Sequence, residues 1–167
     1  MPKLARSLAM TSQRNRRTTT RLTFKKDYME KDLRVSVRRM HIPRIPADEA
    51  ERLVELRRLR TLDTLPESIF EDLTELAAEL CETPMAAISL IDEKRQWFKS
   101  RIGIEALETS RDVAFCAHAI LDDQGLVVRD ASKDPRFLDN PLVTDGPHIQ
   151  FYAGIPLVTG NQHKIGT

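Results

Sequence analysis

Residues 85–102 read MAAISLIDEKRQWFKSRI and contain two strand-like segments joined by a short charged turn. Met85–Ile91 is largely apolar, and Gln96–Ile102 follows the polar residues 92–95. Because so short a connection cannot cross over between parallel strands, the two segments are predicted to pair as an antiparallel hairpin. The other elements are predicted around this hairpin.

Two amphipathic helices are predicted before the hairpin. The first covers Asp48–Leu65, with Asp48 as its N-cap and Glu51 at the capping-box position. Leucines recur in it at every third position and form a slanted stripe: Leu53, Leu56, Leu59 and Leu62. The stripe packs on its own domain or pairs in parallel with a second copy of the chain, and both interpretations remain open.

The second helix is predicted to begin at the capping box of residues 64–67, TLPE, and to end before Pro84. It carries the strongest amphipathic pattern in the chain. Its apolar positions are Ile69, Phe70, Leu73, Leu76, Ala77 and Leu80.

Shorter elements are predicted after the hairpin. In order, they are a loop over 105–110, a short helix ending at Leu121, a strand over 126–129, an irregular stretch over 140–147, a strand over 151–158 and a strand from about His163. Pro156 interrupts the strand over 151–158, so a bulge or an edge is expected there. Helices combined with an antiparallel sheet predict an α+β fold in layers.

Charge divides the chain near Pro46 into two domains. Residues 1–45 hold 13 Lys/Arg and 3 Asp/Glu, whereas residues 46–167 hold 13 and 22. The first segment is predicted to be disordered. It is a basic arm for nucleic acid or acidic lipid, a transit peptide, or a functionless stretch before a true start at Met29 or Met40. The acidic domain, 46–167, is not expected to bind nucleic acid.

The composition excludes several classes of protein. No apolar run approaches the roughly 18 residues of a membrane span, and the N-terminus lacks the apolar segment of a secretory signal. Cys81 and Cys116 are too few for a disulfide framework. A cytoplasmic location without a membrane span is therefore expected.

Cys116 and His118 are the most reactive side chains near the middle of the domain. On a helix, residues two apart point about 200° away from each other, so a nucleophilic pair is not expected. Zinc-ligand spacing, a phosphate loop and a dinucleotide fingerprint are also lacking. Cys116 is interpreted as a small buried apolar group, and His118 as a hydrogen-bonding group in the core or at a pocket rim.

Three aromatic residues add a second possibility for this region. Phe115, Phe151 and Tyr152 either line a small-molecule cavity or fill the core. Together with Cys116 and His118 they form the set of candidate ligand-binding residues. No catalytic residue and no metal ligand is expected, and the cofactor is unknown.

Several of these segments, in this order, resemble GAF domains of bacterial signalling proteins. This sensory type precedes histidine kinase or diguanylate cyclase domains. The resemblance covers Ala47–Thr167, including a lead-in at 62–67 (LDTLPE). The matching stretches are 84–92 (PMAAISLID), 95–100 (RQWFKS), 108–111 (ETSR), 115–120 (FCAHAI), 128–131 (VRDA), 134–137 (DPRF), 139–143 (DNPLV) and 151–158 (FYAGIPLV).

The resemblance implies a central antiparallel sheet with helices on one face and, in many members, a ligand cavity on the other. It implies a non-catalytic sensory domain that binds a small molecule and forms a homodimer, here through the Asp48–Leu65 helix. Family ligands include cyclic nucleotides, bilins and haem, but the sequence contexts of the first two are not matched. With only Cys81 and Cys116, methionine sulfoxide reduction is not expected. The alternatives are a ligand-free interaction module and a non-functional gene fragment.

The resemblance also implies a longer domain than the printed sequence contains. Family members continue past the position of Thr167 through the rest of a strand, an acidic turn and a closing helix. The chain is therefore expected to be C-terminally truncated, with its last strand and closing helix missing. Marginal stability is expected, since the sheet would be left with a short final strand and one uncovered layer.

Overall fold

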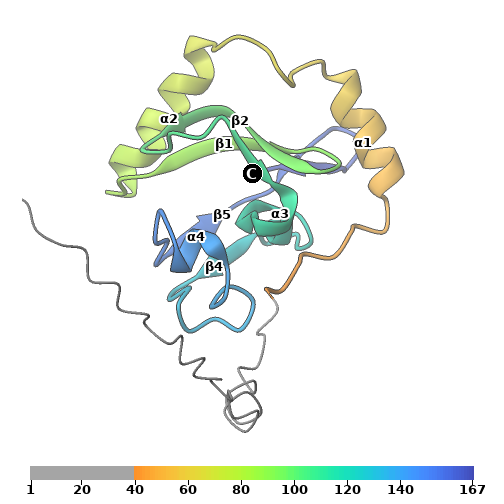
Figure 1. The fold of residues 1–167 in the computed structure, drawn as a ribbon. Helices are drawn as coiled ribbons and strands as arrows, with labels where there is room; N and C mark the ends of the chain where they lie inside the picture. Colours follow the sequence, from red (N-terminus) through yellow and green to blue (C-terminus); the bar gives the residue numbers. More distant parts are fainter. Residues whose placement is uncertain (1–39) are drawn as a thin grey trace, which may run out of the picture. The chain divides into compact units, whose positions relative to one another are not determined.

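A five-stranded antiparallel sheet, in the order β3-β2-β1-β7-β6, lies at the centre of the computed structural model (Figure 1). A second sheet pairs β4 with β5. The structure describes residues 40–167, which belong to one compact unit. The basic extension, which is predicted to be disordered, lies outside the described residues except for residues 40–45. The elements are α1 (Glu49–Arg58), α2 (Ser68–Leu80), β1 (Ala86–Ile91), β2 (Arg95–Ile102), β3 (Glu108–Ser110), η2 (Arg111–Val113), α3 (Phe115–Ala119), β4 (Leu126–Val128), α4 (Pro141–Thr144), β5 (Tyr152–Gly154), β6 (Leu157–Val158) and β7 (Lys164–Gly166).

β1 and β2 form the predicted antiparallel hairpin. The backbone N–H of Asp92 donates to the carbonyl of Arg95 at 2.8 Å and closes the turn. Pairing runs from the turn to the far end of both strands, with a bulge between Ile88 and Ser89. β7 pairs on the other side of β1. The predicted α+β fold, a central antiparallel sheet flanked by helices, is confirmed.

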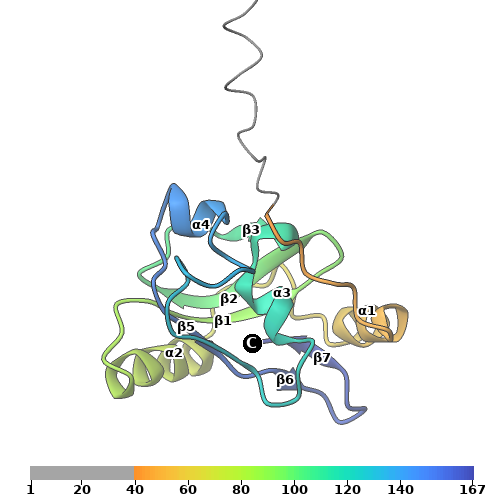
Figure 2. The same cartoon turned by 90° about the horizontal axis from the view of Figure 1, so that it is seen from below.

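Alternating side chains of β2 serve the two faces of the sheet. Trp97 packs in a buried cluster with the α1 leucines, whereas Gln96 reaches α3 by donating a hydrogen bond to Cys116. The helices α1 and α2 lie on one face, apart from each other, and α3, α4, β4 and β5 lie on the other (Figures 1 and 2). Successive side chains of a strand point to opposite faces, so one strand supports both layers.

The first helix is shorter than the predicted Asp48–Leu65. α1 stops at Arg58, and Arg60 adopts the left-handed conformation (φ 51°), which takes the chain out of the helix. Asp48 occupies the N-cap position without capping, because its carboxylate binds Nδ1 of His163 at 2.7 Å. Of the predicted stripe, Leu53 and Leu56 are buried in their own domain. For these two leucines the first of the two interpretations is confirmed.

The predicted capping box before α2 does not form. α2 begins at Ser68, and no side chain caps its first turn. Thr64 and Glu67 instead accept hydrogen bonds from the ammonium group of Lys99, at 2.7 and 2.5 Å. The Lys99 side chain is almost fully buried beneath this segment. Because a buried ammonium group requires hydrogen-bond acceptors, Thr64 and Glu67 bind Lys99 instead of capping the helix.

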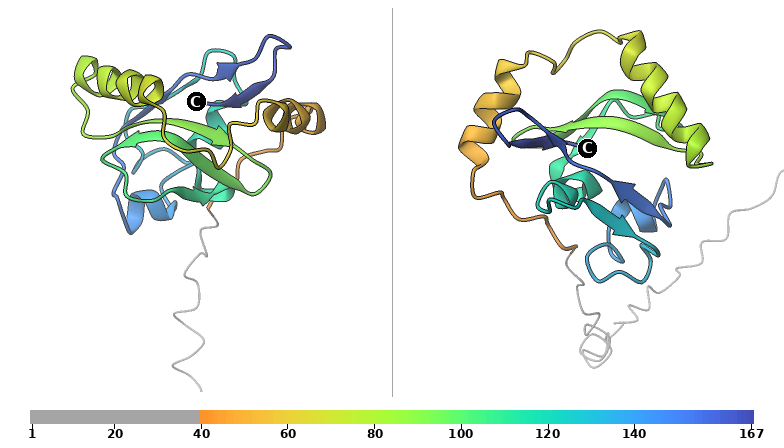
Figure 3. Two further views of the ribbon diagram at one scale, coloured as in Figure 1. Left: turned by 90° about the horizontal axis from the view of Figure 1, so that it is seen from above. Right: turned by 180° about the vertical axis from the view of Figure 1, so that it is seen from behind.

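Most of the large apolar side chains predicted along α2 are exposed in the structure. The helix contacts β1 and β2, and its least exposed residues are Phe70, Thr74 and Ala78, spaced four apart along one side. The remaining large apolar side chains of α2 are 50–75% exposed: Ile69, Leu73, Leu76 and Leu80. α1 therefore buries Leu53 and Leu56, whereas α2 leaves most of its large apolar side chains exposed. The two helices lie apart from each other on the sheet (Figure 3).

Three predictions for the second half of the domain are wrong in detail. Residues 108–110, predicted as loop, form β3 and pair with β2. Residues 141–144, predicted as irregular, form α4, where Asn140 caps the backbone N–H of Leu142 and Pro141 occupies the first turn. The single strand predicted over 151–158 divides at Pro156 into β5 and β6, which belong to different sheets.

Candidate functional site

α3 carries three of the candidate residues to the centre of the domain. The 3₁₀ turn η2 precedes it, and the hydroxyl of Ser110 caps that turn by accepting from the backbone N–H of Asp112 at 3.3 Å. Phe115, Cys116, Ala117 and Ala119 are buried, while His118 is half-buried. Burial of nearly every side chain fixes α3 against the sheet.

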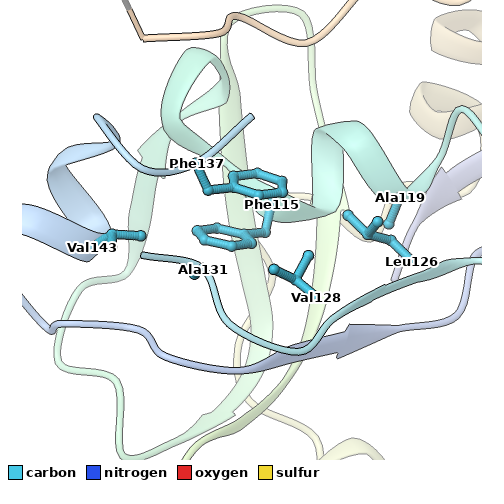
Figure 4. Close-up of a cluster of buried hydrophobic side chains, with 7 residues drawn as sticks. All are labelled: Phe115, Ala119, Leu126, Val128, Ala131, Phe137 and Val143. Carbon is cyan, nitrogen blue, oxygen red and sulfur yellow. The ribbon is translucent and has the colours of Figure 1, made fainter. Parts of the chain in front are cut away.

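The aromatic candidates separate into core and surface. Phe115 stacks on Phe137 with ring centroids 4.0 Å apart and packs on Tyr152 at 5.2 Å. Figure 4 shows Phe115 and Phe137 stacked within the buried apolar cluster. Phe151 is 58% exposed and belongs to none of the buried clusters. The structure therefore brings Phe115 and Tyr152 together and leaves Phe151 apart from them.

Polar groups converge on Cys116 between the sheet and α3. The side-chain amide of Gln96 donates to the Cys116 sulfur at 3.0 Å and to the hydroxyl of Ser89 at 2.9 Å. The Tyr152 hydroxyl donates to the same sulfur at 3.3 Å. Burial raises the pKa of Tyr152 well above its usual value, which keeps the phenol protonated as a donor. The result is a buried chain of hydrogen bonds in an otherwise apolar layer.

His118 faces a different environment from Cys116, as their spacing predicts. Its ring packs edge-on against Phe137 at 4.9 Å and stacks on His41 at 5.8 Å. Its Nε2 atom is buried and has no hydrogen-bond partner. Burial, followed by the proximity of His41, lowers the pKa of His118 to about 4. The imidazole is therefore neutral at physiological pH.

A glutamate from α1 links that helix to the segment before α3. Glu49 accepts hydrogen bonds from Arg111 at 2.5 and 3.1 Å and from Arg52 at 2.8 and 2.9 Å. Burial raises the pKa of Glu49, but the hydrogen bonds from the two arginines outweigh it and lower the pKa to about 2. Arg52 also donates to the carbonyl of Ile91 at 2.6 Å. This ion cluster connects the two helical layers around the end of the hairpin.

A cavity of about 630 Å³ opens beside α3. Its walls come from the linker 41–48, the end of α3 with the following turn, and the β6–β7 hairpin. His118 is the only candidate residue among those that line it. Within residues 40–167, no group of His, Cys, Asp and Glu has the geometry of a metal site.

Residues 65–167 match the model of the GAF domain family. The chain belongs to the GAF domain family. GAF domains are generally sensory and regulatory modules, and the domain itself is not catalytic. The family resemblance inferred from the sequence is thus confirmed.

This GAF domain is similar to part of a larger enzyme. A cyclic di-GMP phosphodiesterase of Pseudomonas aeruginosa is 41% identical over 128 residues, which are 77% of this chain and 22% of that protein. The chain therefore spans about a fifth of the relative's length. Among residues 40–167, no helix has the length and apolar character that crossing a membrane requires.

Two solved structures are also similar. A GAF sensor protein from Burkholderia vietnamiensis is 18% identical, covers 70% of this chain and 72% of its own, and has a TM-score of 0.47. The GAF domain of an Acinetobacter phosphoenolpyruvate-protein phosphotransferase is 17% identical, with coverages of 70% and 73% and a TM-score of 0.46.

Sequence reasoning missed the polar residues that surround α3 in this GAF domain. Gln96 and Ser89 lie on strands, and only the strand alternation together with the bulge in β1 places both beside Cys116. Arg52 offered a usable signal, since it stands beside Leu53 and three residues from Glu49 on the inward side of an amphipathic helix. The partnership of Glu49 with Arg111, 62 residues away, had no local signal.

Proposed function

We propose that this GAF domain is a regulatory sensory module that binds a small molecule between the sheet and α3. The observation that supports the proposal is the buried hydrogen-bond chain of Ser89, Gln96, Cys116 and Tyr152. If stability were its only role, this core would be at least as stable with apolar side chains in place of the polar ones. A few convergent polar groups in an apolar layer are typical of small-molecule sites.

Ligand binding can be tested with a pair of cysteine variants. Native mass spectrometry of the purified chain and thermal-shift screening of a metabolite library would identify a ligand. Cys116→Ala removes the acceptor shared by Gln96 and Tyr152 and is expected to weaken binding by about tenfold. Cys81→Ala is the matched control, because Cys81 is exposed. If no compound binds, or if both variants bind equally well, the site between the sheet and α3 is not the ligand site.

The ion cluster around Glu49 links this site to α1. Arg111 immediately precedes the α3 region, and Glu49 holds it to the first turn of α1. A ligand that displaces the segment 111–116 would therefore change the contacts of α1. We propose that the domain acts in the cytoplasm and that its output is the control of cyclic di-GMP hydrolysis by catalytic residues outside it, by analogy with the phosphodiesterase of similar sequence.

A second candidate function is dimerisation, supported by the exposed apolar side of α2. Ile69, Leu73, Leu76 and Leu80 form a surface that water does not favour. The sequence predicted a homodimer through the Asp48–Leu65 helix, but Leu53 and Leu56 of that helix are buried within their own domain. We therefore propose α2 as the helix through which two copies pair.

Light scattering coupled to size exclusion would separate the two helices. The double variant Leu73→Glu/Leu76→Glu is expected to convert a dimer to a monomer, because charged side chains oppose burial of α2. Val54→Glu is the matched control on α1, where Val54 is 65% exposed. If Val54→Glu alone dissociates the dimer, the interface lies on α1 and not on α2. A monomeric wild-type chain would exclude dimerisation as the function.

A further inference from the structure

The cavity beside α3 is separate from the site between the sheet and α3. His41 and the linker residues 44–48 form one side of it, and His118, residues 120–123, residues 125–126 and Arg136 form another. Gln162 and Lys164, from the β6–β7 hairpin, complete the lining. Its volume of about 630 Å³ lies within the roughly 300–1,000 Å³ range of small-molecule sites. Segments distant in the sequence therefore build one concave space.

Two of the three carboxylates that line the cavity are paired with basic side chains. The carboxylate of Asp48 binds Nδ1 of His163 at 2.7 Å, and this hydrogen bond lowers the pKa of Asp48. Asp122 accepts from the backbone N–H of Gln124 at 2.9 Å. Asp123 pairs with Lys164. Asp48 and Asp123 are therefore paired within the domain, whereas Asp122 is exposed and keeps its negative charge.

The basic groups of the cavity are not all paired. Arg44 is exposed and lines the cavity, and it forms no salt bridge or side-chain hydrogen bond with another described residue. Arg136 is held in place by Asp134 through contacts of 2.9 and 2.6 Å. Arg44 thus has no partner among the described residues, and Arg136 supplies a second guanidinium in a fixed orientation.

His118 adds an unused hydrogen-bonding atom to the same wall. Its Nε2 is buried without a partner, and such an atom costs about 1–3 kcal/mol when it is left unsatisfied. Within the described residues, the other such atom is Nε of Arg111, which does not line the cavity. A ligand that meets the imidazole with a polar group would remove this cost.

We propose that this cavity binds a small anionic molecule, with its carboxylate or phosphate group at Arg44 and a polar group at His118. Arg136, fixed by its salt bridge to Asp134, adds a guanidinium of set orientation to the cavity lining. Guanidinium groups bind both kinds of anion through paired N–H donors. The linker that carries Arg44 leads directly into α1, and Asp48 and Arg52 also line the cavity. An anion at Arg44 therefore orders the linker next to the first turn of α1.

The test is a set of NMR titrations of the full chain with inorganic phosphate, with citrate and with chloride at constant ionic strength. Saturable shifts of the His41 and His118 imidazole signals with phosphate or citrate are expected, and the more effective anion identifies the class. Arg44→Gln is expected to weaken binding at least tenfold. Arg129→Gln is the matched control, because Arg129 is exposed, lies outside the cavity and has no salt bridge with the described residues. This control is expected to bind like the wild type.

Three results would overturn the proposal. Equal shifts with chloride would show ionic screening alone, and equal binding by the Arg44→Gln and Arg129→Gln variants would show that Arg44 is not the anchor. Shifts centred on Cys116 and Tyr152 would place the anion between the sheet and α3. That last result would exclude the cavity as the anion site while supporting the proposed function. Anion binding at Arg44 with no ligand near Cys116 would support the cavity and contradict the proposed function.

Discussion

At Glu49, burial and hydrogen bonding act in opposite directions. Burial favours the neutral carboxylic acid, whereas four hydrogen bonds from Arg52 and Arg111 favour the carboxylate. The hydrogen bonds prevail because both guanidinium groups are almost fully buried and Glu49 is the only carboxylate that pairs with either of them among the described residues. Removing it would leave two buried positive charges without a counter-ion.

Glu49→Gln is expected to destabilise the domain at neutral pH. The folded pKa of about 2 lies below the ordinary value of 4.5, a difference equivalent to about 3 kcal/mol. Because the folded-state pKa is depressed, this stability is present above pH 4.5 and is lost as pH falls toward 2. Urea unfolding at pH 7 and pH 3 measures it. Glu51→Gln, an exposed acid of the same turn, is the control, and equal effects of the two variants would contradict the prediction.

His118 is expected to add a second, higher pH window. Its pKa of about 4 lies below the ordinary 6.5, so the unfolded chain binds a proton between these values and the folded domain does not. Stability should therefore decrease as pH falls from 6.5 to 4. An NMR titration of the His118 ring and unfolding curves across this range measure both effects. His118→Gln should remove this part of the pH dependence, and a ring that titrates near 6.5 would contradict the prediction.

At the scale of elements, the sheet decides which side of each helix is buried. α1 places its leucines against β1, β2 and β7, so its periodicity and its packing agree. α2 contacts the sheet through Phe70, Thr74 and Ala78, and its own apolar stripe remains at the surface. Helical spacing identified an apolar side on both helices, but the sheet buries leucines of that side in α1 and leaves most of it exposed in α2.

The orientation of α1 can be measured with two truncations. Leu56→Ala is expected to lower the free energy of unfolding by about 2–5 kcal/mol, because Leu56 is fully buried and a cavity would remain. Val54→Ala on the exposed side should cost less than about 0.5 kcal/mol. Denaturant unfolding of both variants provides the comparison. Similar losses would show that α1 does not pack as described.

Gly103 ends the β1–β2 hairpin in a conformation that other residues rarely adopt. Its φ is +68°, and a Cβ there would lie 2.1 Å from the carbonyl oxygen of Pro84. Gly103→Ala is therefore expected to cost at least about 1–3 kcal/mol. Gly160→Ala is the control, because its Cβ would meet no atom within 4 Å. Thermal melts of the two variants that coincide would contradict the strained geometry.

At the scale of the whole molecule, charge separates the two ends of the chain. Residues 1–45 are strongly basic and residues 46–167 are acidic, although the net charge of the whole is only +1. A field of one sign over the folded domain governs its encounters with charged partners more than the net charge does. Polyanions such as duplex DNA are therefore poor partners for the domain.

Duplex DNA binding should depend on the basic end. The chain without residues 1–39 is expected to show no retention on a DNA column at about 50 mM salt, where phosphate contacts are at their strongest. Any retention of the full chain should disappear on raising the salt. Equal retention of both proteins would contradict the assignment of DNA binding to the basic N-terminal segment.

The sheet and the hairpin were predictable because their signals are local. The apolar run of residues 85–91 and the short polar connection at 92–95 depend on neighbouring residues, and the structure contains the hairpin that they predict. β3 and α4 were missed because their formation depends on partners outside the segment: β2 for the first, and for the second the carbonyl of Val113, to which the side chain of Asn140 donates at 2.9 Å. The candidate Phe115 and Tyr152 were found together, but Phe151 lies at the surface.

By itself, the sequence determined the α+β class, the GAF family, the central hairpin and the separation of Cys116 from His118. The family follows from the resemblance of several segments to GAF domains, and the other features follow from residue order, spacing and periodicity, which act over short distances. Only the tertiary structure decided which face of α2 is buried, which residues surround Cys116, and that Arg44 and His118 share one cavity. Each of these depends on side chains that are remote in the chain, and burial and hydrogen bonding select such pairs only after the layers have packed.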